Sequence, residues 1–355
     1  MKTLLNCIEE IPERLTDIYE GRENLFELLK GYVGNKKINK IVVVASGTSF
    51  NGAFTTKLFG EKILNIPVDI IYPNLFLNYF NKNLLSEDIL YLFISQTGTT
   101  RLVYNSLKLV KDKGLMNISI TEDLDSPIAK EASLVIDMKT GGEKYIYRTI
   151  GYSATCGILY MLYLNILRIK GNISCDDYTA YGSDFLLAVN NLENIMDEVI
   201  KWYSGSPLPL RTFKKFIFSG TSDLYPVAME ADIKFMEMVP VFTNSFEIEE
   251  LIHGPQNAFD DETGYFLISK AGADSDKAIK IADFIHNEIG NNSIIVGNNI
   301  ARDTDINIEV KSKNFYPLEV ITVFQVLAYK LAVDKGRDLS VRLHSEINNY
   351  ITKSL

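Results

Sequence analysis

The chain of 355 residues has few cysteines, few histidines and more acidic than basic side chains. Its formal net charge of -9 at pH 7, without a basic stripe, opposes a nucleic-acid partner, because such binding relies on clustered Lys and Arg. Cys7, Cys156 and Cys175 show neither a CxxC pair nor metal-ligand spacing, and an odd number gives no disulfide framework. We therefore expect inert core thiols, a reducing cytoplasm, and no metal or cofactor.

Long uninterrupted hydrophobic runs are also scarce. The segment MKTLLNCIEEIPERL at the N-terminus carries acidic residues within its first ten positions, so we expect no signal peptide. The most apolar stretch, Gly151–Leu167, is at the lower limit for a membrane span and predicts a buried core helix. A composition of 46% hydrophobic and 23% charged residues is that of a soluble globular protein without a membrane partner, long enough for two domains.

Hydrophobic periodicity predicts an α/β fold. Apolar positions at helical spacing over residues 3–34, interrupted by Pro12 and Gly21, predict helices. From residue 38 onward, β-branched runs alternate with amphipathic segments, which indicates a doubly wound parallel sheet covered on both faces. The strands expected in this part of the chain are 38–45, 67–72, 89–95, 116–122 and 133–138.

The same order of elements then recurs. SGTS stands at residues 46–49 and 219–222, each time after a hydrophobic strand, and LFIS at 92–95 has a counterpart, FLIS, at 266–269. These pairs lie at nearly one offset, which indicates a tandem duplication of one flavodoxin-like domain with bridging helices. We expect N-terminal helices over 1–37, a first domain over 38–185, a helical linker over 186–212, a second domain over 213–336 and a tail over 337–355.

The segment Tyr91–Thr100 reads YLFISQTGTT, an apolar strand that breaks into a polar loop. The hydroxyls of Ser95, Thr97 and Thr100, together with backbone N–H groups and the following helix N-terminus, suit a phosphate. The alternative is a capped strand-to-helix turn with Thr100 as the N-cap. The counterpart at Ser269–Asp276 has lost a hydroxyl and gained acids, so one copy is expected to bind the phosphate.

Titratable residues gather in the second copy. Glu230, Lys234 and Glu237 share one face of a predicted helix directly after the second SGTS, although an exposed surface ladder shows the same spacing. His253 precedes a predicted Gly-Pro turn and has three glutamates nearby, which suits acid–base chemistry near neutral pH. The alternative is a solvated loop histidine.

Five motifs in this order, ASGTSF, SQTGTT, SPIAKEA, EADIKFME and EELIHGP, resemble the tandem sugar isomerase (SIS) family. The similarity is greatest to the isomerase half of glucosamine-6-phosphate synthase. It implies a catalytic Glu237 that moves a proton between C1 and C2, Glu230 and Lys234 as its partners, and His253 assisting ring opening from the neighbouring subunit of a homodimer with shared active sites. It also implies a sugar-phosphate site at Thr48, Ser49, Ser95, Gln96, Thr97 and Thr100.

Two departures from the synthase pattern affect the expected reaction. The chain has no glutaminase domain with an N-terminal cysteine, so we expect no release of ammonia from glutamine. The synthase also has a Schiff-base lysine four residues after an arginine in its tail, whereas Arg342 is followed at that position by Glu346. That lysine is therefore absent unless Lys353 substitutes for it, and we leave open whether the reaction includes a Schiff-base step.

These observations predict a phosphosugar isomerase acting at C1 and C2 of a hexose or aminosugar 6-phosphate. A fructosamine-6-phosphate deglycase or an aminosugar-phosphate deaminase would use the same proton transfer and then hydrolyse the product. A further alternative is a non-catalytic sensor of sugar phosphates. A sensor that regulates transcription would be expected to carry a DNA-binding segment, and the acidic N-terminal helices offer none.

Overall fold

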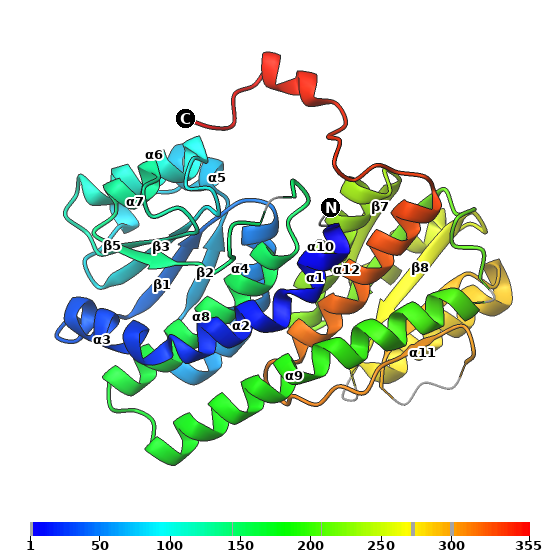
Figure 1. Cartoon of the computed structure of the whole chain (residues 1–355), viewed down its shortest axis with the longest axis horizontal. Helices are drawn as coiled ribbons and strands as arrows, with labels where there is room; N and C mark the ends of the chain where they lie inside the picture. The colour runs from blue at the N-terminus through cyan, green and yellow to red at the C-terminus, as the bar shows by residue number, and fades with distance from the viewer. Residues whose placement is uncertain (1–2, 144, 207, 271–273, 299–301) are drawn as a thin grey trace. The chain divides into compact units, whose positions relative to one another are not determined.

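The computed structural model describes residues 3–143, 145–206, 208–270, 274–298 and 302–355 (Figure 1). The chain divides into two compact units, and each is described here by itself. The first-sheet unit comprises Glu13–Gly182 and Arg342–Leu355. The second-sheet unit comprises Met1–Pro12 and Ser183–Val341.

The first-sheet unit contains a five-stranded sheet in the order β2-β1-β3-β4-β5, and all four strand pairs are parallel. Chain order reverses between β1 and β3, which is the switch point at which open α/β sheets bind ligands. The predicted doubly wound sheet is therefore confirmed. Its strands are β1 (Lys40–Val44), β2 (Val68–Ile71), β3 (Ile89–Ile94), β4 (Asn117–Thr121) and β5 (Leu134–Asp137).

Helices cover this sheet. Side chains from α5, α6 and α7 pack with Val42, Tyr91 and Phe93 in one hydrophobic cluster. Elsewhere α4 packs against β2 and α8, and α3 packs against α8. The helices are α2 (Ile11–Glu20), α3 (Arg22–Val33), α4 (Thr48–Leu64), α5 (Pro73–Asn78), α6 (Arg101–Lys111), α7 (Pro127–Glu131) and α8 (Ile150–Ile169), with short turns η1 (Lys82–Leu84) and η6 (Ser345–Asn349).

Two glycines set the distance between α4 and α8. A Cβ atom on Gly52 would lie 3.0 Å from Cβ of Thr155, and one on Gly60 would lie 2.8 Å from the ring of Tyr163. A larger residue at Gly60 would force the Tyr163 ring to shift, and one at Gly52 would require Thr155 to move by a few tenths of an ångström, so both positions favour glycine. The two helices are therefore in close contact at two points along α4.

The second-sheet unit repeats the topology with the order β10-β9-β8-β6-β7, again parallel throughout. Its strand β6 takes the place of β1, so the predicted duplication has a counterpart in the strand order. The strands are β6 (Lys215–Gly220), β7 (Phe242–Glu247), β8 (Thr263–Ile268), β9 (Ser293–Gly297) and β10 (Ile306–Asn307).

Five helices are described in the second-sheet unit, and two of them, α9 and α12, are long. The five are α1 (Leu4–Glu9), α9 (Cys175–Gly205, which begins in the first-sheet unit), α10 (Tyr225–Met238), α11 (Ser275–Phe284) and α12 (Tyr316–Asp334), with short turns η2 (Ser222–Leu224), η3 (Glu250–Ile252), η4 (Pro255–Ala258) and η5 (Ile285–Ile289). Helix α12 closes, as predicted, at Gly336, whose φ of 70° suits a C-terminal cap.

Among the residues that the structure describes, two helices, α8 and α12, are long and apolar enough to cross a membrane, but 100% and 83% of their most apolar windows are buried. The prediction of a buried core helix over Gly151–Leu167 is confirmed. The expectation for the cysteines is wrong for one of the three. Cys7 and Cys156 are buried, whereas Cys175 is exposed, because it begins a helix whose first turn is polar.

Five phenylalanines form the centre of the second-sheet unit. Phe218 and Phe266, on adjacent strands, stack with ring centroids 5.3 Å apart, and Phe324 of α12 meets both rings edge-on at 5.6 and 5.7 Å. Phe216 and Phe235 complete the cluster. Aromatic burial of this kind contributes much of the core energy.

Phe218→Ala should lower the free energy of unfolding by about 3–5 kcal/mol, because it leaves a cavity in this cluster. Phe242→Ala is the matched control, since Phe242 is 84% exposed on the edge strand β7, and it should change stability by at most about 0.5 kcal/mol. Urea unfolding followed by circular dichroism measures both. Equal midpoints for the two variants would contradict the assigned core.

Candidate functional site

The predicted phosphate loop lies at the switch point of the first sheet. Strands β1 and β3 are neighbours, with Val44 paired to Phe93, so the loops that follow them leave the same edge side by side. Helix α4 begins directly after the first loop, at Thr48, and α6 begins after the second, at Arg101. Two helix N-termini therefore start at neighbouring positions, which favours binding of an anion.

The loop from Ser95 to Thr100 leaves several donors open. Gly98 has a φ of 67° and donates its N–H to the Ser95 carbonyl at 2.9 Å, which turns the chain back on itself. Among the described residues, no hydrogen-bond partner is found for the amide N–H groups of Gln96, Thr97 and Thr99. Successive unpaired amides in such a turn form a nest that suits an anion.

The hydroxyls of this loop bond to one another. The Oγ atoms of Ser95 and Thr100 lie 2.8 Å apart, and those of Thr97 and Thr99 lie 2.9 Å apart. Thr100 occupies the N-cap position, but its side chain makes no capping hydrogen bond. In the alternative of a capped turn, the position of Thr100 as the N-cap is therefore correct, but the expected hydrogen bond to its side chain is absent. The two hydroxyls predicted from the first loop, those of Thr48 and Ser49, are half-buried at the start of α4.

Gln96 differs from a simple phosphate donor. Its side-chain nitrogen donates to Glu122 Oε2 at 3.0 Å and to Glu143 Oε2 at 3.2 Å. Since a primary amide carries two N–H hydrogens, both are engaged by carboxylates. Gln96 can contribute its backbone N–H to an anion, but its side chain offers no further donor.

The C-terminal tail pairs with the phosphate loop, a contact that the sequence analysis did not predict (Figure 1). Ser354 forms an antiparallel bridge with Thr100, the Arg101 N–H donates to the Lys353 carbonyl at 3.0 Å, and the Leu355 N–H donates to the Thr99 carbonyl at 3.0 Å. Lys353 therefore lies directly beside the loop.

In the second-sheet unit, α10 brings the three predicted titratable residues together. The Lys234 ammonium lies 2.7 Å from Glu237 Oε2 and 3.6 Å from Glu230 Oε1. Glu230 and Lys234 are fully buried, whereas the Glu237 side chain is 40% exposed. The alternative of an exposed surface ladder is wrong for the two buried members. A buried ammonium needs anionic partners, so Lys234 holds the accessible Glu237 carboxylate in place.

The position of Glu237 along α10 is also informative. The helix starts at Tyr225, next to the carboxyl end of β6, and Glu237 is its penultimate residue. At 1.5 Å per residue, Glu237 lies roughly 18 Å along the helix from Tyr225. This carboxylate is therefore remote from the carboxyl edge of the second sheet.

His253 lies apart from this group. It follows η3, its Nδ1 atom is 2.8 Å from the Glu249 carbonyl oxygen, and its side chain is 57% exposed. Glu249 in turn forms an ion pair with Lys277, which lowers the pKa of its carboxyl group. Within the described part of the chain, no hydrogen bond or ion pair joins His253 to the α10 residues.

Near the loop of the second sheet that corresponds to Ser95–Thr100, two described carboxylates accept hydrogen bonds from side-chain hydroxyls. Residues 271–273 of this loop lie outside the described residues. Asp274 is the N-cap residue of α11 and accepts a hydrogen bond from Thr221 Oγ1 at 3.1 Å. Asp223 accepts one from the Tyr316 hydroxyl, whose pKa is raised by burial and by this carboxylate. Asp274, one of the two acids expected to repel phosphate, thus binds a donor at this edge, and Asp223 binds another.

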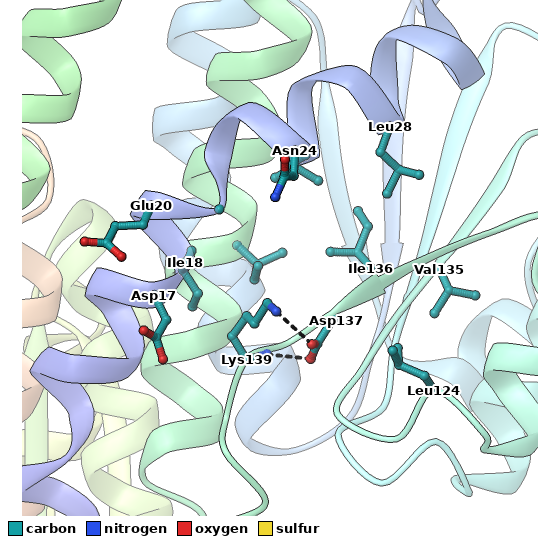
Figure 2. A pocket seen from close by; sticks show the side chains of 13 residues that line it. Asp17, Ile18, Glu20, Asn24, Leu28, Leu124, Val135, Ile136, Asp137 and Lys139 are labelled. Atoms are coloured by element: carbon teal, nitrogen blue, oxygen red, sulfur yellow. Dashed lines mark hydrogen bonds and ion pairs between the residues drawn. The ribbon is translucent and has the colours of Figure 1, made fainter.

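A cavity of about 760 Å³ lies elsewhere in the first-sheet unit, between α2, α3 and β5 (Figure 2). Apolar side chains such as Leu28 and Ile136 line it, and Asp137 pairs with Lys139 at its border. No residue of the phosphate loop lines it. Among the described residues, no group of three or more His, Cys, Asp or Glu could hold a metal ion.

The chain is similar to several known proteins. Residues 36–165 match the SIS domain family. The chain carries a SIS domain. It is 27% identical over 341 residues to a glutamine–fructose-6-phosphate aminotransferase (isomerizing) of Fusobacterium nucleatum, a match that covers 93% of the chain and 55% of that protein. The chain thus spans about half the length of the curated relatives it matches.

Two solved structures share the fold. A candidate phosphosugar isomerase of Clostridium difficile 630 superimposes with a TM-score of 0.91 at 24% identity, over 100% of this chain and 99% of that one. The C-terminal domain of a glucosamine-fructose-6-phosphate aminotransferase from Francisella tularensis gives 0.79 at 21% identity, over 95% and 97%. The resemblance stated from the motifs is confirmed, and so is the tandem arrangement of the fold.

Gly98→Ala should disrupt the loop. A Cβ atom there would lie 2.0 Å from Ser126 Oγ, and the residue has a positive φ. Gly114→Ala is the matched control, because Gly114 has a φ of 69° and nothing within 4 Å of its Cβ position. Both variants should lose about 1–2 kcal/mol from the left-handed conformation, and only Gly98→Ala should lose affinity for fructose 6-phosphate in calorimetric titration. Equal affinities in the two variants would contradict this role of the loop.

Proposed function

We propose that this chain is a phosphosugar isomerase that transfers a proton between C1 and C2 of a hexose or aminosugar 6-phosphate. The observation that carries the proposal is the buried Lys234 between two glutamates, one of which, Glu237, reaches solvent. Such a carboxylate is placed to accept a proton from a substrate carbon while its position is held by the ammonium. The SIS domain, and the phosphosugars in the names of its relatives, support the substrate class.

The phosphate would be bound by the first domain, residues 38–185. The unpaired amides of Gln96, Thr97 and Thr99 and the N-termini of α4 and α6 provide donors without a bulky cationic side chain. The hydroxyls in this set are those of Thr48, Ser49, Ser95, Thr97 and Thr100. Binding there fixes the C6 end of the substrate.

The chemistry would be supplied by the second domain, residues 213–336. From an open-chain aldose, Glu237 removes the proton on C2, the electron pair forms the C1–C2 double bond, and the carbonyl oxygen on C1 takes up a proton. Return of the proton from Glu237 to C1, with loss of the C2 hydroxyl proton, gives the ketose. His253 would pass the ring-opening proton from a second copy of the chain in a homodimer, and Glu230 would complete the pairing of Lys234.

The tail supports a role for Lys353. Its carbonyl accepts a hydrogen bond from the Arg101 N–H at the start of α6, so its backbone lies beside the phosphate loop. We propose that its amine, reaching from this backbone position, condenses with the open-chain carbonyl and releases water, so that the imine nitrogen takes the place of the carbonyl oxygen during the proton transfer. Addition of water to the resulting imine then frees the ketose and the amine. We further infer that the enzyme acts in the cytoplasm.

Glu237→Gln should lower kcat by about 10²–10⁴-fold, because the amide cannot accept the carbon-bound proton, while affinity for the sugar phosphate is kept. The assay follows turnover of glucose 6-phosphate, glucosamine 6-phosphate, fructose 6-phosphate with ammonia, and fructosyl-amino-acid 6-phosphates. Glu193→Gln, an exposed change in α9, is the control.

The product distinguishes the alternatives. Release of an amine from a fructosyl-amino-acid phosphate would indicate a deglycase in place of the isomerase. Release of ammonia from glucosamine 6-phosphate would indicate a deaminase. Binding of every sugar phosphate without reaction would favour a sensor. Full activity in Glu237→Gln would show that Glu237 is not the base that accepts the proton from carbon.

Lys353→Met should abolish trapping of the substrate by borohydride. In the unaltered protein, reduction of the imine should add the mass of one sugar phosphate to the tail peptide. Lys113→Met, which changes an exposed lysine after α6, is the control and should trap normally. Trapping in Lys353→Met, or none in the unaltered protein during turnover, would show that Lys353 forms no imine.

A further inference from the structure

We propose that Glu143 is a positioning residue for the phosphate loop, acting through the side-chain amide of Gln96. The inference deepens the proposed function, on which it rests for the identity of the anion. Its structural part concerns only how the loop is held. Glu143 directly follows the glycine pair Gly141-Gly142.

Glu143 is 5% exposed, and its carboxylate accepts five hydrogen bonds. Oε1 accepts from the Thr149 N–H at 2.7 Å, the Thr149 hydroxyl at 3.0 Å and the Ile150 N–H at 3.1 Å. Oε2 accepts from the Gly151 N–H at 3.1 Å and from Gln96 Nε2 at 3.2 Å. One buried carboxylate thus joins the start of α8 to the phosphate loop.

The charge of Glu143 is matched by its surroundings. Its donors include the first amides of the 20-residue helix α8, where the helix dipole is positive. The N-terminus of α8 is therefore already satisfied by an internal anion and is closed to a ligand. A glutamine at this position would present an NH₂ group to one of these donors, and a buried N–H would lose its acceptor.

Gln96 is held from two further sides. Its second side-chain hydrogen is bound by Glu122, which also accepts from the Thr140 hydroxyl at 2.5 Å. Its main-chain carbonyl accepts from the Glu122 N–H at 2.9 Å and the Thr121 hydroxyl at 3.0 Å. The residue is therefore anchored through both its side chain and its backbone.

The amide of Gln96 also packs directly on α8. A Cβ atom on Gly151 would lie 2.1 Å from Gln96 Oε1, so this contact requires a glycine. Gln96 therefore cannot rotate freely. Its fixed position also restrains the loop that carries the N–H groups of Gln96, Thr97 and Thr99. Preorganised donors bind more tightly, because less conformational entropy is lost on binding.

The experiment compares Glu143→Gln with Glu319→Gln. Glu319 is an equally buried glutamate of α12 that accepts from Asn191 Nδ2 and from the N–H groups of Lys311 and Ser312 at 2.7–3.1 Å. Both variants should lower the Tm. Only Glu143→Gln should weaken binding of fructose 6-phosphate and of inorganic phosphate in calorimetry, by about tenfold.

A double-mutant cycle with Gln96→Ala tests whether Glu143 acts through Gln96. In the Gln96→Ala background, Glu143→Gln should have little further effect on affinity, because the coupled pair is already broken. Undiminished, additive losses would overturn the proposal. So would equal loss of affinity in Glu143→Gln and Glu319→Gln, which would indicate general destabilisation.

Hydrogen exchange separates this inference from the proposed function. The Gly98 amide, which donates to the Ser95 carbonyl, should exchange faster in Glu143→Gln than in Glu319→Gln, with or without ligand. If the unaltered protein binds no sugar phosphate, the proposed function fails, while faster exchange still supports the positioning role. If the unaltered protein binds and exchange of the Gly98 amide is the same in both variants, the positioning role alone fails.

Discussion

The constraint on which the site depends is the need of backbone N–H groups at helix N-termini for acceptors. In the first-sheet unit, β1 and β3 end side by side and each passes into a helix, so donors accumulate at one place. The N-terminus of α8 is satisfied by Glu143. Amides of the loop after β3 remain without acceptors among the described residues. This open set is where we propose that an external anion binds.

The two copies solve the same problem differently. In the first, a loop glutamate reaches forward to the amides that begin α8. In the second, Glu319 on α12 reaches back to the amides of the preceding loop. The donors around Thr221 and Tyr316 are also taken by the protein's own carboxylates. The duplicated domain has therefore kept its strand order, while two side-chain donors at this edge of the second copy are bound by carboxylates of the chain itself.

Much of the fold follows from local pattern. The β-branched runs, the repeated SGTS and the glycine after α12 predicted the strands, the duplication and a helix end, because these depend on neighbours in sequence. The orientation of the Gln96 amide and the pairing of Lys353 with α6 depend on contacts between segments distant in sequence. The exposure of Cys175 depends on where α9 begins. Hydrophobic periodicity contains no information on either. The spacing of Glu230, Lys234 and Glu237 predicted their pairing but not their burial. Their catalytic roles and the domain boundaries stay predictions.

The close packing of α4 on α8 gives the site a frame. Gly52 and Gly60 remove the side chains that would separate the helices, so backbone and rings lie in contact. Helix α4 begins with the hydroxyls of Thr48 and Ser49, and α8 begins with the amides that hold Glu143. The packed pair of α4 and α8 thus positions both the hydroxyls of Thr48 and Ser49 and the Glu143 carboxylate that binds Gln96. The conformational entropy of ordering this scaffold is lost during folding and not when an anion binds. A small shift of either helix would move both the hydroxyls and the anchor of Gln96.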